Sequence, residues 1–221
     1  MARCGGLGPL AGGAVLTRRS NSDLRDKGDV NPQDRGLIAA IDAAEHHIFA
    51  LNPALNVRPI LAALARAALR GVRVKAVVSL NMDRAFQRYF AGGDNTDSAY
   101  RLLSALLGAG GEASADRVRI LWAPSETGAA ASPSDPCNVH AKVTSFDRTC
   151  LWLGSMNWDW QSWNNSREPS VALFDAPASA AREAGPYATR ARLAAPLRAG
   201  DLPRIHCYGA DPVFRYLRRR G

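Results

Sequence analysis

Two side chains capable of nucleophilic and electrostatic catalysis stand close together in the second half of the chain. His140 and Lys142 are two positions apart in an apolar, β-branched segment that predicts a strand. Residues two apart on a strand point to the same face, roughly 7 Å apart. An imidazole beside a fixed ammonium suits attack on a phosphodiester, because the cation neutralises the charge that builds on the non-bridging oxygens. We therefore expect both side chains to face one pocket.

Further polar residues follow at short spacing. Ser155 and Asn157, again two apart, come at the end of the next predicted strand and could donate hydrogen bonds to the same phosphate. Asp147 lies in the polar turn between the two strands, five residues after Lys142. A carboxylate at a turn commonly accepts backbone hydrogen bonds, so we expect Asp147 to hold the hairpin rather than to touch a substrate.

The spacing of these residues resembles the phospholipase D superfamily. His140, Lys142 and Asp147 fit the pattern H-x-K-x-x-x-x-D, and a G-S-x-N pattern containing Ser155 and Asn157 follows. So many polar positions matched at fixed spacing are far less expected by chance than a lone histidine on a strand.

The resemblance also implies a role for each matched residue. It implies that His140 is the nucleophile, which forms a phosphohistidine, and that Lys142, Ser155 and Asn157 bind the phosphate. It further implies that Asp147 completes the catalytic motif. Glu168 matches the acidic position that, in the family, accepts a hydrogen bond from the nucleophilic histidine and fixes its tautomer.

The resemblance also implies that this chain supplies half of an active site. In the family the complete site uses two such motifs, and the second histidine protonates the leaving alcohol. Positions 31–122 contain no second H-x-K. The partner is therefore expected to be a second lobe, contributed either by homodimerisation or by a missing N-terminal half. A weaker resemblance of the upstream segment to second lobes favours the latter arrangement.

Three functions fit these residues. The first is a phospholipase D-type phosphodiesterase or transphosphatidylase acting on phospholipid head groups, and the second is a nuclease that uses the same chemistry. The third is a non-catalytic lobe that packs or binds anions. A phospholipid substrate is favoured over nucleic acid. No cofactor and no metal are expected, because Lys142 and the paired donors supply the positive charge.

The elements that must position these residues predict an α/β fold. Apolar periodicity predicts a strand, a helix and a strand over 47–51, 59–70 and 72–80, which form a right-handed crossover with parallel strands. Other segments predict a mixed sheet flanked by helices, as in phospholipase D-like lobes. They are helices at 37–44 and 100–107, a strand at 118–122, a hairpin at 139–146 and 150–153, a short helix from 159, and a strand at 170–174.

The domain organisation follows from composition. Residues 1–30 are Gly-rich and then polar, and are expected to be flexible, whereas 31–175 form the catalytic lobe, starting with a helix capped by Asn31. Residues 176–221 are an Ala/Pro/Arg-rich extension, with a short helix expected between Pro186 and Pro196.

Overall composition narrows the classes of function only slightly. The 221 residues are 47% hydrophobic and carry a formal charge of +8. This charge favours encounters with polyanions, although most of the excess is scattered arginine, for which solubility is the simpler explanation. The four cysteines are far apart, so neither a zinc site nor a redox motif is expected. We expect a cytoplasmic protein, with secretion as the open alternative.

Two other clusters are expected to be structural. His46 and His47 lie at a helix-to-strand junction with no partner at ligand spacing, which favours surface or core roles. Four tryptophans could stack on a base or line a lipid pocket, but such clusters are more often packing. They are Trp152, Trp158, Trp160 and Trp163.

Overall fold

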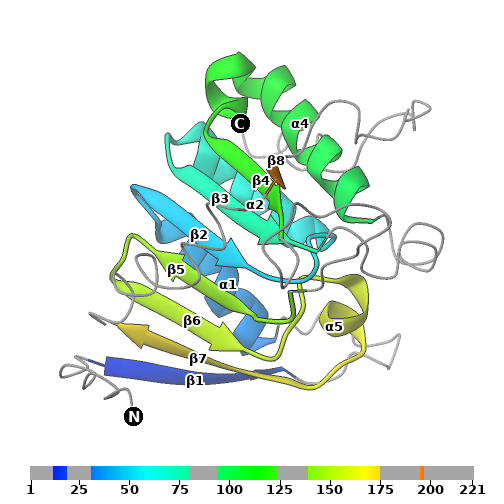
Figure 1. Cartoon of the computed structure of the whole chain (residues 1–221). Coiled ribbons are helices and arrows are strands. Elements are labelled where there is room, and N and C mark those ends of the chain that lie inside the picture. Colours follow the sequence, from blue (N-terminus) through cyan, green and yellow to red (C-terminus); the bar gives the residue numbers. More distant parts are fainter. Residues whose placement is uncertain (1–11, 19–30, 80–93, 124–138, 175–194, 197–221) are drawn as a thin grey trace, which may run out of the picture.

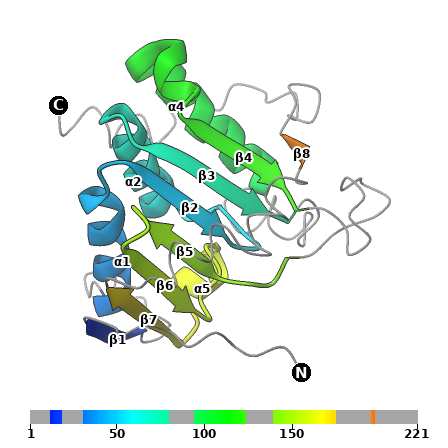
Figure 2. The ribbon, with the colours of Figure 1, turned by 60° about the vertical axis from the view of Figure 1, so that its left-hand side comes forward.

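A single mixed sheet organises the chain (Figures 1 and 2). The structure is a computed structural model that describes residues 12–18, 31–79, 94–123, 139–174 and 195–196. Within this part of the chain the strand order is β1-β7-β6-β5-β2-β3-β4-β8. The strands are β1 (Gly12–Arg18), β2 (His47–Leu51), β3 (Arg73–Val78), β4 (Val118–Trp122), β5 (Val143–Phe146), β6 (Cys150–Gly154), β7 (Glu168–Phe174) and β8 (Ala195–Pro196).

The centre of the sheet is parallel, as the crossover pattern predicts. β2, β3 and β4 pair in parallel, whereas every other neighbouring pair is antiparallel. Helix α2 (Arg58–Leu69) connects β2 to β3 and ends before Gly71, whose φ of 106° suits a residue without a side chain. The α/β fold with a mixed sheet and flanking helices is confirmed.

The hairpin of β5 and β6 forms as predicted, but β5 starts at Val143 rather than at 139, so His140 and Lys142 lie before the strand and not in it as expected. β5 and β6 pair antiparallel, with Phe146 opposite Cys150. Asp147 and Arg148 between them both have positive φ, 51° and 61°. Two left-handed residues in succession give the turn whose twist matches that of the flanking strands.

Helices cover one face of the sheet. In Figure 2, α1 (Pro32–Ala43) and α2 lie together on one side of the strands, with α4 (Asn95–Ala115) packed beside α2. Their apolar residues, including Leu37, Ile41 and Leu64, form the main core with alternate positions of the strands. A smaller cluster occupies the opposite face and consists of Phe49, Leu51, Val77, Leu121, Ala123 and Val139. No described helix is long and apolar enough to cross a membrane.

The expectation that residues 1–30 are flexible is wrong for one part of that segment. Gly12–Arg18 forms edge strand β1, which pairs antiparallel with β7. The side chain of Arg18 is buried and bonds to Asp34 of α1. Sequence patterns miss this strand because it starts with two glycines and because its partner lies about 150 residues away.

Two further elements differ from expectation. Helix α4 is longer than 100–107, because Asp94 and Asp97 form a reciprocal capping box that starts it earlier. At its other end, Gly111 with φ 67° interrupts the helical geometry. Ala195–Pro196 pairs with β4 as a strand, whereas the rest of the helix expected between Pro186 and Pro196 lies outside the described residues.

Candidate active site

The histidine-lysine-aspartate motif begins at the edge of the sheet where β2 and β3 end. The segment that carries it is fastened there by Ser79, which follows β3 and is buried. The N–H of Val139 donates to Ser79 Oγ at 3.0 Å, and Ser79 Oγ donates to the carbonyl of Val139 at 3.2 Å. His140 is the next residue, so its backbone position is tied to the end of a central strand.

The segment before β5 presents different side chains to the two faces of the sheet. Val139 and Ala141 pack into the small cluster on the helix-free face. Lys142, in contrast, lines a small pocket together with Thr144 and Trp152, and Trp152 belongs to the main core. Residues 139–142 precede β5 and are not part of the strand, and His140 is not among the residues that line this pocket, so the expectation that both side chains face one pocket stays a prediction. The Lys142 ammonium donates to the carbonyl of His140 at 2.8 Å, and the His140 side chain is exposed.

Lys142 has an unusual electrostatic environment for a lysine. Burial lowers the pKa of its ammonium, and the carboxylates of Glu168 and Asp159 act against that shift. The two carboxylates therefore lie close enough to favour the charged form. The hydrogen bond to the carbonyl of His140 places this ammonium beside the His140 backbone.

Ser155 and Glu168 are in direct contact across neighbouring strands. Ser155 follows β6, Glu168 begins β7, and the Ser155 hydroxyl donates to the Glu168 carboxylate. The Ser155 N–H also donates to the carbonyl of Pro169, at 3.1 Å. In this part of the structure no hydrogen bond joins Glu168 to the His140 ring, which differs from the expectation. The reason is the strand order: β7 lies next to β6, which puts Ser155, rather than the segment before β5, against Glu168.

Asn157 lies in a loop that two other polar side chains, Asp159 and Asn52, hold in place. Its amide donates to Asp159 at 3.1 Å, and Asp159 also accepts from the N–H of Ser162 at 2.6 Å, as the cap of helix α5 (Trp160–Asn164). The other amide atom, Asn157 Oδ1, is buried without a hydrogen-bond partner. A second amide, Asn52, holds the same loop by donating to the carbonyl of Met156 and accepting from Trp158 N–H.

Asp159 and Asn52 are functional-site residues that sequence reasoning missed. Asp159 was expected only as the start of a short helix, although its place two residues after Asn157 and before a helix is the signal of a capping residue next to the motif. Asn52 gave no signal, because it follows β2 and meets the loop only in three dimensions.

Asp147 lies at the far end of the hairpin from His140. Its carboxylate accepts three backbone N–H groups at 2.7–2.9 Å, from Glu45, His46 and His47. Burial acts to raise the pKa of this carboxyl, but the three N–H groups and His47 outweigh it and lower the pKa below its ordinary value. The prediction that Asp147 belongs with the catalytic residues is corrected: its carboxylate fastens the turn to the start of β2. We expected Asp147 to accept hydrogen bonds from the backbone of the hairpin itself. The observed donors lie instead about 100 positions earlier in the chain.

Other candidates take structural places. Trp152 and Trp158 are buried in the main core and Trp163 packs against it, as expected of a packing cluster, whereas Trp160 is exposed. No three His, Cys, Asp or Glu side chains among the described residues are placed to hold a metal ion.

Comparison with a protein-family model decides the family. A model described as "Cardiolipin synthase, PLD-like domain" matches residues 37–184, which is more than half of the chain. The chain belongs to this phospholipase D-like family. The family was predicted from the histidine-lysine-aspartate spacing, and that prediction is confirmed. No curated protein matches the sequence.

Solved structures share the phospholipase D-like fold. Nuc from Salmonella typhimurium, a phospholipase D family member, aligns with a TM-score of 0.57 at 17% identity, over 85% of this chain and 99% of its own. NucT from Helicobacter pylori aligns with a TM-score of 0.54 at 15% identity, over 84% and 100%. Phosphatidylserine synthase from Haemophilus influenzae aligns with a TM-score of 0.60 at 12% identity, over 94% of this chain but only 44% of its own.

Proposed function

We propose that the chain is a phospholipase D-type phosphodiesterase or transphosphatidylase that contributes one histidine to a paired site. The observation that carries the proposal is that the Lys142 ammonium lies against the backbone of His140 and interacts with Glu168, to which the Ser155 hydroxyl donates. The His140 ring attacks phosphorus, the bond from phosphorus to the leaving oxygen breaks, and a phosphohistidine forms. Water or an alcohol then attacks phosphorus and releases His140.

Each neighbouring residue has a part in this reaction. Lys142 neutralises the non-bridging oxygens as the fifth bond to phosphorus forms. Glu168 opposes the lowering of the Lys142 pKa by burial, which favours the charged ammonium, and it orients the Ser155 hydroxyl. Asn157 keeps its second amide hydrogen for the phosphate while the first bonds to Asp159. Glu168 therefore acts through Ser155 and Lys142 in this proposal, rather than by holding the His140 ring.

The second histidine has to come from another lobe. A nucleophilic imidazole must be deprotonated, whereas the leaving alkoxide needs a proton, so one His140 cannot serve both roles in the same step. General-acid help is worth a factor of about 10² to 10⁴ in rate. An isolated lobe should therefore be nearly inactive, and the partner is either a second copy of this chain or a lobe from another part of a longer product.

The proposal is tested with bis(p-nitrophenyl) phosphate, in the presence of a chelator, while the oligomeric state is followed by sedimentation. Dimers should hydrolyse the diester and His140→Ala should not. A covalent phosphoryl adduct trapped by rapid acid quenching should likewise be absent from His140→Ala. In mixtures of the two chains, activity should fall faster than the wild-type fraction, because a mixed dimer lacks one histidine. A strictly monomeric chain with normal turnover, or activity that needs a specific divalent metal, would overturn the proposal.

Phospholipids and nucleic acids both present the phosphodiester that this site would attack. A phospholipid head group was favoured from the sequence, and it would need a wide apolar groove beside His140. The described pocket beside Lys142 is small, and its walls include Asn52 and Ser170 as well as tryptophans. A larger, strongly basic pocket lies on another part of the sheet, and this observation favours a nuclease as the second candidate. Release of choline from phosphatidylcholine vesicles and cleavage of single-stranded DNA separate the two.

A further inference from the structure

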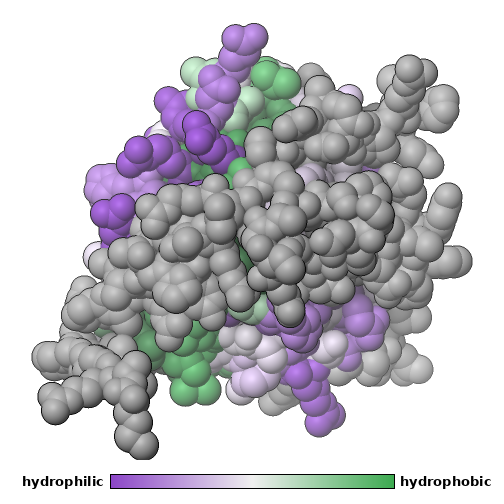
Figure 3. Space-filling view, in the orientation of Figure 1, coloured by the Kyte–Doolittle hydropathy of each residue, from purple (hydrophilic) through white to green (hydrophobic). Residues whose placement is uncertain are grey.

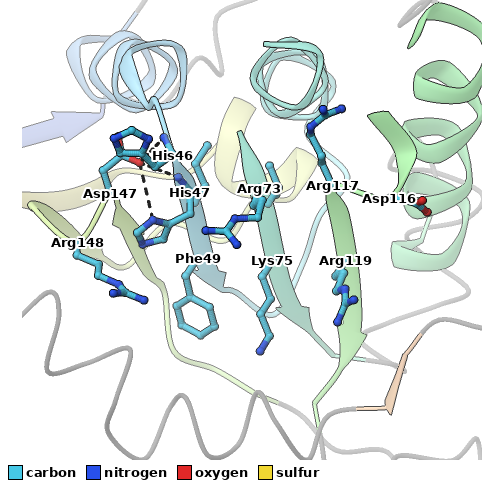
Figure 4. Close-up of a pocket in the computed structure, with 12 residues that line it drawn as sticks. His46, His47, Phe49, Arg73, Lys75, Asp116, Arg117, Arg119, Asp147 and Arg148 are labelled. Atoms are coloured by element: carbon cyan, nitrogen blue, oxygen red, sulfur yellow. Dashed lines mark hydrogen bonds and ion pairs between the residues drawn. The ribbon is translucent and has the colours of Figure 1, made fainter. Parts of the chain in front are cut away.

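The small pocket beside Lys142 differs in kind from the large basic pocket of this sheet. The basic pocket has a volume of about 760 Å³, and Figure 4 shows its cations Arg73, Lys75 and Arg119 on β3 and β4. Figure 3 shows hydrophilic surface over the part of the molecule where β3 and β4 start in Figure 1. Lys75 and Arg148 of that pocket already interact with other groups of the chain. The small pocket, in contrast, lies among residues of the main core.

The walls of the small pocket come from three neighbouring strands and from the loops that follow β2 and β6. Ser170 of β7 pairs with Gly154 of β6, and two residues along both strands Ala172 pairs with Trp152. Trp152 pairs on its other side with Thr144 of β5. Trp152 and Ala172 belong to the main core, so Ser170 and Thr144 share their face of the sheet. The lining residues are Asn52, Lys142, Thr144, Trp152, Gly154, Met156, Trp158 and Ser170.

The hydroxyl of Ser170 has no hydrogen-bond partner in the described part of the chain. Ser170 is only 2% exposed, so bulk water does not compensate for this. A buried polar group that is left unsatisfied costs free energy, and such groups nearly always bond to protein or to an ordered water. The hydroxyl therefore needs a partner inside the pocket that it lines.

The size of the pocket selects that partner. The space open to water in it is about 10 Å³, and a single water molecule needs about 10–15 Å³ by the same measure. A phosphate ion is much larger and does not fit. A bound water also needs two to four polar partners, and the pocket offers the polar groups of Asn52, Lys142, Thr144 and Ser170.

These four groups have hydrogen-bonding capacity to spare. The Lys142 ammonium has three N–H donors and gives one of them to the carbonyl of His140. Asn52 uses one amide hydrogen in the loop after β6 and keeps the other. The hydroxyls of Thr144 and Ser170 can each donate and accept. Lys142 and Ser170 make no direct hydrogen bond with each other in the described structure, so a water between them satisfies both.

We propose that the pocket binds one water molecule that links the Ser170 hydroxyl to the Lys142 ammonium, and that Ser170 is thereby a positioning residue for Lys142. The positioning role rests on the proposed phosphodiesterase function. The water accepts from Lys142 and donates to Ser170 Oγ, and Thr144 and Asn52 complete its shell. Lys142 is then held on two sides, by the carbonyl of His140 and by the water, and its third N–H remains for the phosphate.

A crystal structure of the chain at high resolution tests the binding directly. Density for a water should lie about 2.5–3.2 Å from both Lys142 Nζ and Ser170 Oγ. In Ser170→Ala/Thr144→Val, which removes both hydroxyls, that water should be lost or displaced. A Ser170 hydroxyl bonded directly to another protein group, or a water that contacts only one of the two residues, would overturn the proposal.

Folding stability distinguishes a water-bonded hydroxyl from an unsatisfied one. Ser98 of α4 supplies the matched control, because its hydroxyl is also buried without a partner among the described residues but lies outside the pocket. Removing an unsatisfied hydroxyl is neutral or stabilising, so Ser98→Ala should leave the unfolding equilibrium constant in urea unchanged or lower. Ser170→Ala breaks a hydrogen bond and should raise that constant roughly 2- to 10-fold. Equal behaviour of the two variants would contradict a bound water.

The protonation of Lys142 reads out the positioning role. The lysines of the chain are Lys27, Lys75 and Lys142, so isotope labelling at the lysine ε carbon gives few NMR signals, and Lys142→Arg assigns the relevant one. Burial lowers the pKa of this ammonium, whereas Glu168 of β7 and Asp159 before α5 act against that shift. His140 lies beside it in the same segment.

The charged groups around Lys142 are the same in wild type and in Ser170→Ala/Thr144→Val, so a change in its titration reports the water. Loss of the water removes a hydrogen bond to the charged form, and the pKa of Lys142 should therefore be lower in this double variant than in wild type. In Ser98→Ala it should be unchanged. An equal Lys142 pKa in all three chains would mean that Ser170 does not act on Lys142.

Activity separates failure of this proposal from failure of the proposed function. With bis(p-nitrophenyl) phosphate, Ser170→Ala/Thr144→Val should lower kcat by less than the factor of about 10² to 10³ that loss of a direct donor costs, with little change in KM. Ser98→Ala should keep the wild-type rate. A wild-type kcat in the double variant, with the water lost, would overturn the positioning role. No hydrolysis by any chain, with the water and the Lys142 titration as expected, would remove the proposed function and leave the water site standing.

Discussion

His140 and Asp147 belong to one sequence motif but lie at opposite ends of strand β5. His140 precedes the strand at the edge where β2 and β3 end, whereas Asp147 follows it and accepts backbone N–H groups from Glu45, His46 and His47. In the proposed enzyme the motif would therefore combine two tasks, catalysis at one end of the hairpin and attachment of the hairpin at the other.

Replacing Asp147 by alanine should destabilise the fold and spare the chemistry. Three N–H groups lose their acceptor: that of His47 is half-buried and those of Glu45 and His46 are exposed, so water recovers part of the cost of about 1–3 kcal/mol that an unsatisfied buried group carries. Urea unfolding should show a loss of roughly 2–4 kcal/mol. Hydrolysis per folded molecule, measured well below the melting temperature, should stay within a few fold of wild type. A folded Asp147→Ala chain that is as inactive as His140→Ala would contradict this division of tasks.

The stabilisation by Asp147 should depend on pH in one direction. Its pKa is lower in the folded chain than in the unfolded one, so its contribution is complete above the unfolded pKa of about 3.9 and disappears as pH falls through the folded value. The difference in urea midpoint between wild type and Asp147→Asn should be constant from neutral pH to about pH 5 and should shrink below about pH 4. A difference that grows on acidification would show that the carboxylate is not stabilised in this way.

The ion pair between Arg18 of β1 and Asp34 of α1 should contribute strongly to the stability of the fold. Arg18 is 2% exposed, its Nε donates to both Asp34 oxygens at 3.0 and 3.2 Å, and its guanidinium lies 5.8 Å from the ring centroid of Trp163. Arg18→Met leaves a buried carboxylate without its cation and should cost about 3–5 kcal/mol in urea unfolding. Arg18→Met/Asp34→Leu removes both charges and should recover a large part of that loss. Equal stabilities of the single and double variants would mean that the charge of Asp34 is not the source of the cost.

Gly154 should tolerate no side chain. A Cβ at this position would lie 2.3 Å from Ser170 Oγ and 2.9 Å from the carbonyl oxygen of Pro169, and the latter belongs to the backbone and cannot rotate away. Gly154→Ala should therefore cost about 1–3 kcal/mol and, by moving the adjacent Ser155, should lower turnover at least tenfold. Gly12→Ala is the matched control on an edge strand, because its nearest atom would be 4.0 Å away. A chain with Gly154→Ala that matches Gly12→Ala in both stability and turnover would show that β6 and β7 can separate without consequence.

The local elements and the family were determined by the sequence itself. The helical and alternating apolar patterns predict β2, α2, β3 and the β5–β6 hairpin, because each pattern needs only neighbouring residues to define the buried face. The spacing of His140, Lys142 and Ser155 likewise predicts that they gather at one end of that hairpin. These features are local, so a single chain segment is enough to specify them.

Only the tertiary structure decided which distant segments meet. β1 forms because β7 offers it an open edge, and Glu168 bonds to Ser155, rather than to the His140 ring, because β7 is placed beside β6. The backbone that Asp147 holds and the row formed by Phe49, Lys75 and Arg119 are likewise set by the strand order. Local patterns reveal which face of a strand is buried, but they carry little information on which strand will lie beside it, since backbone hydrogen bonds are the same for every partner.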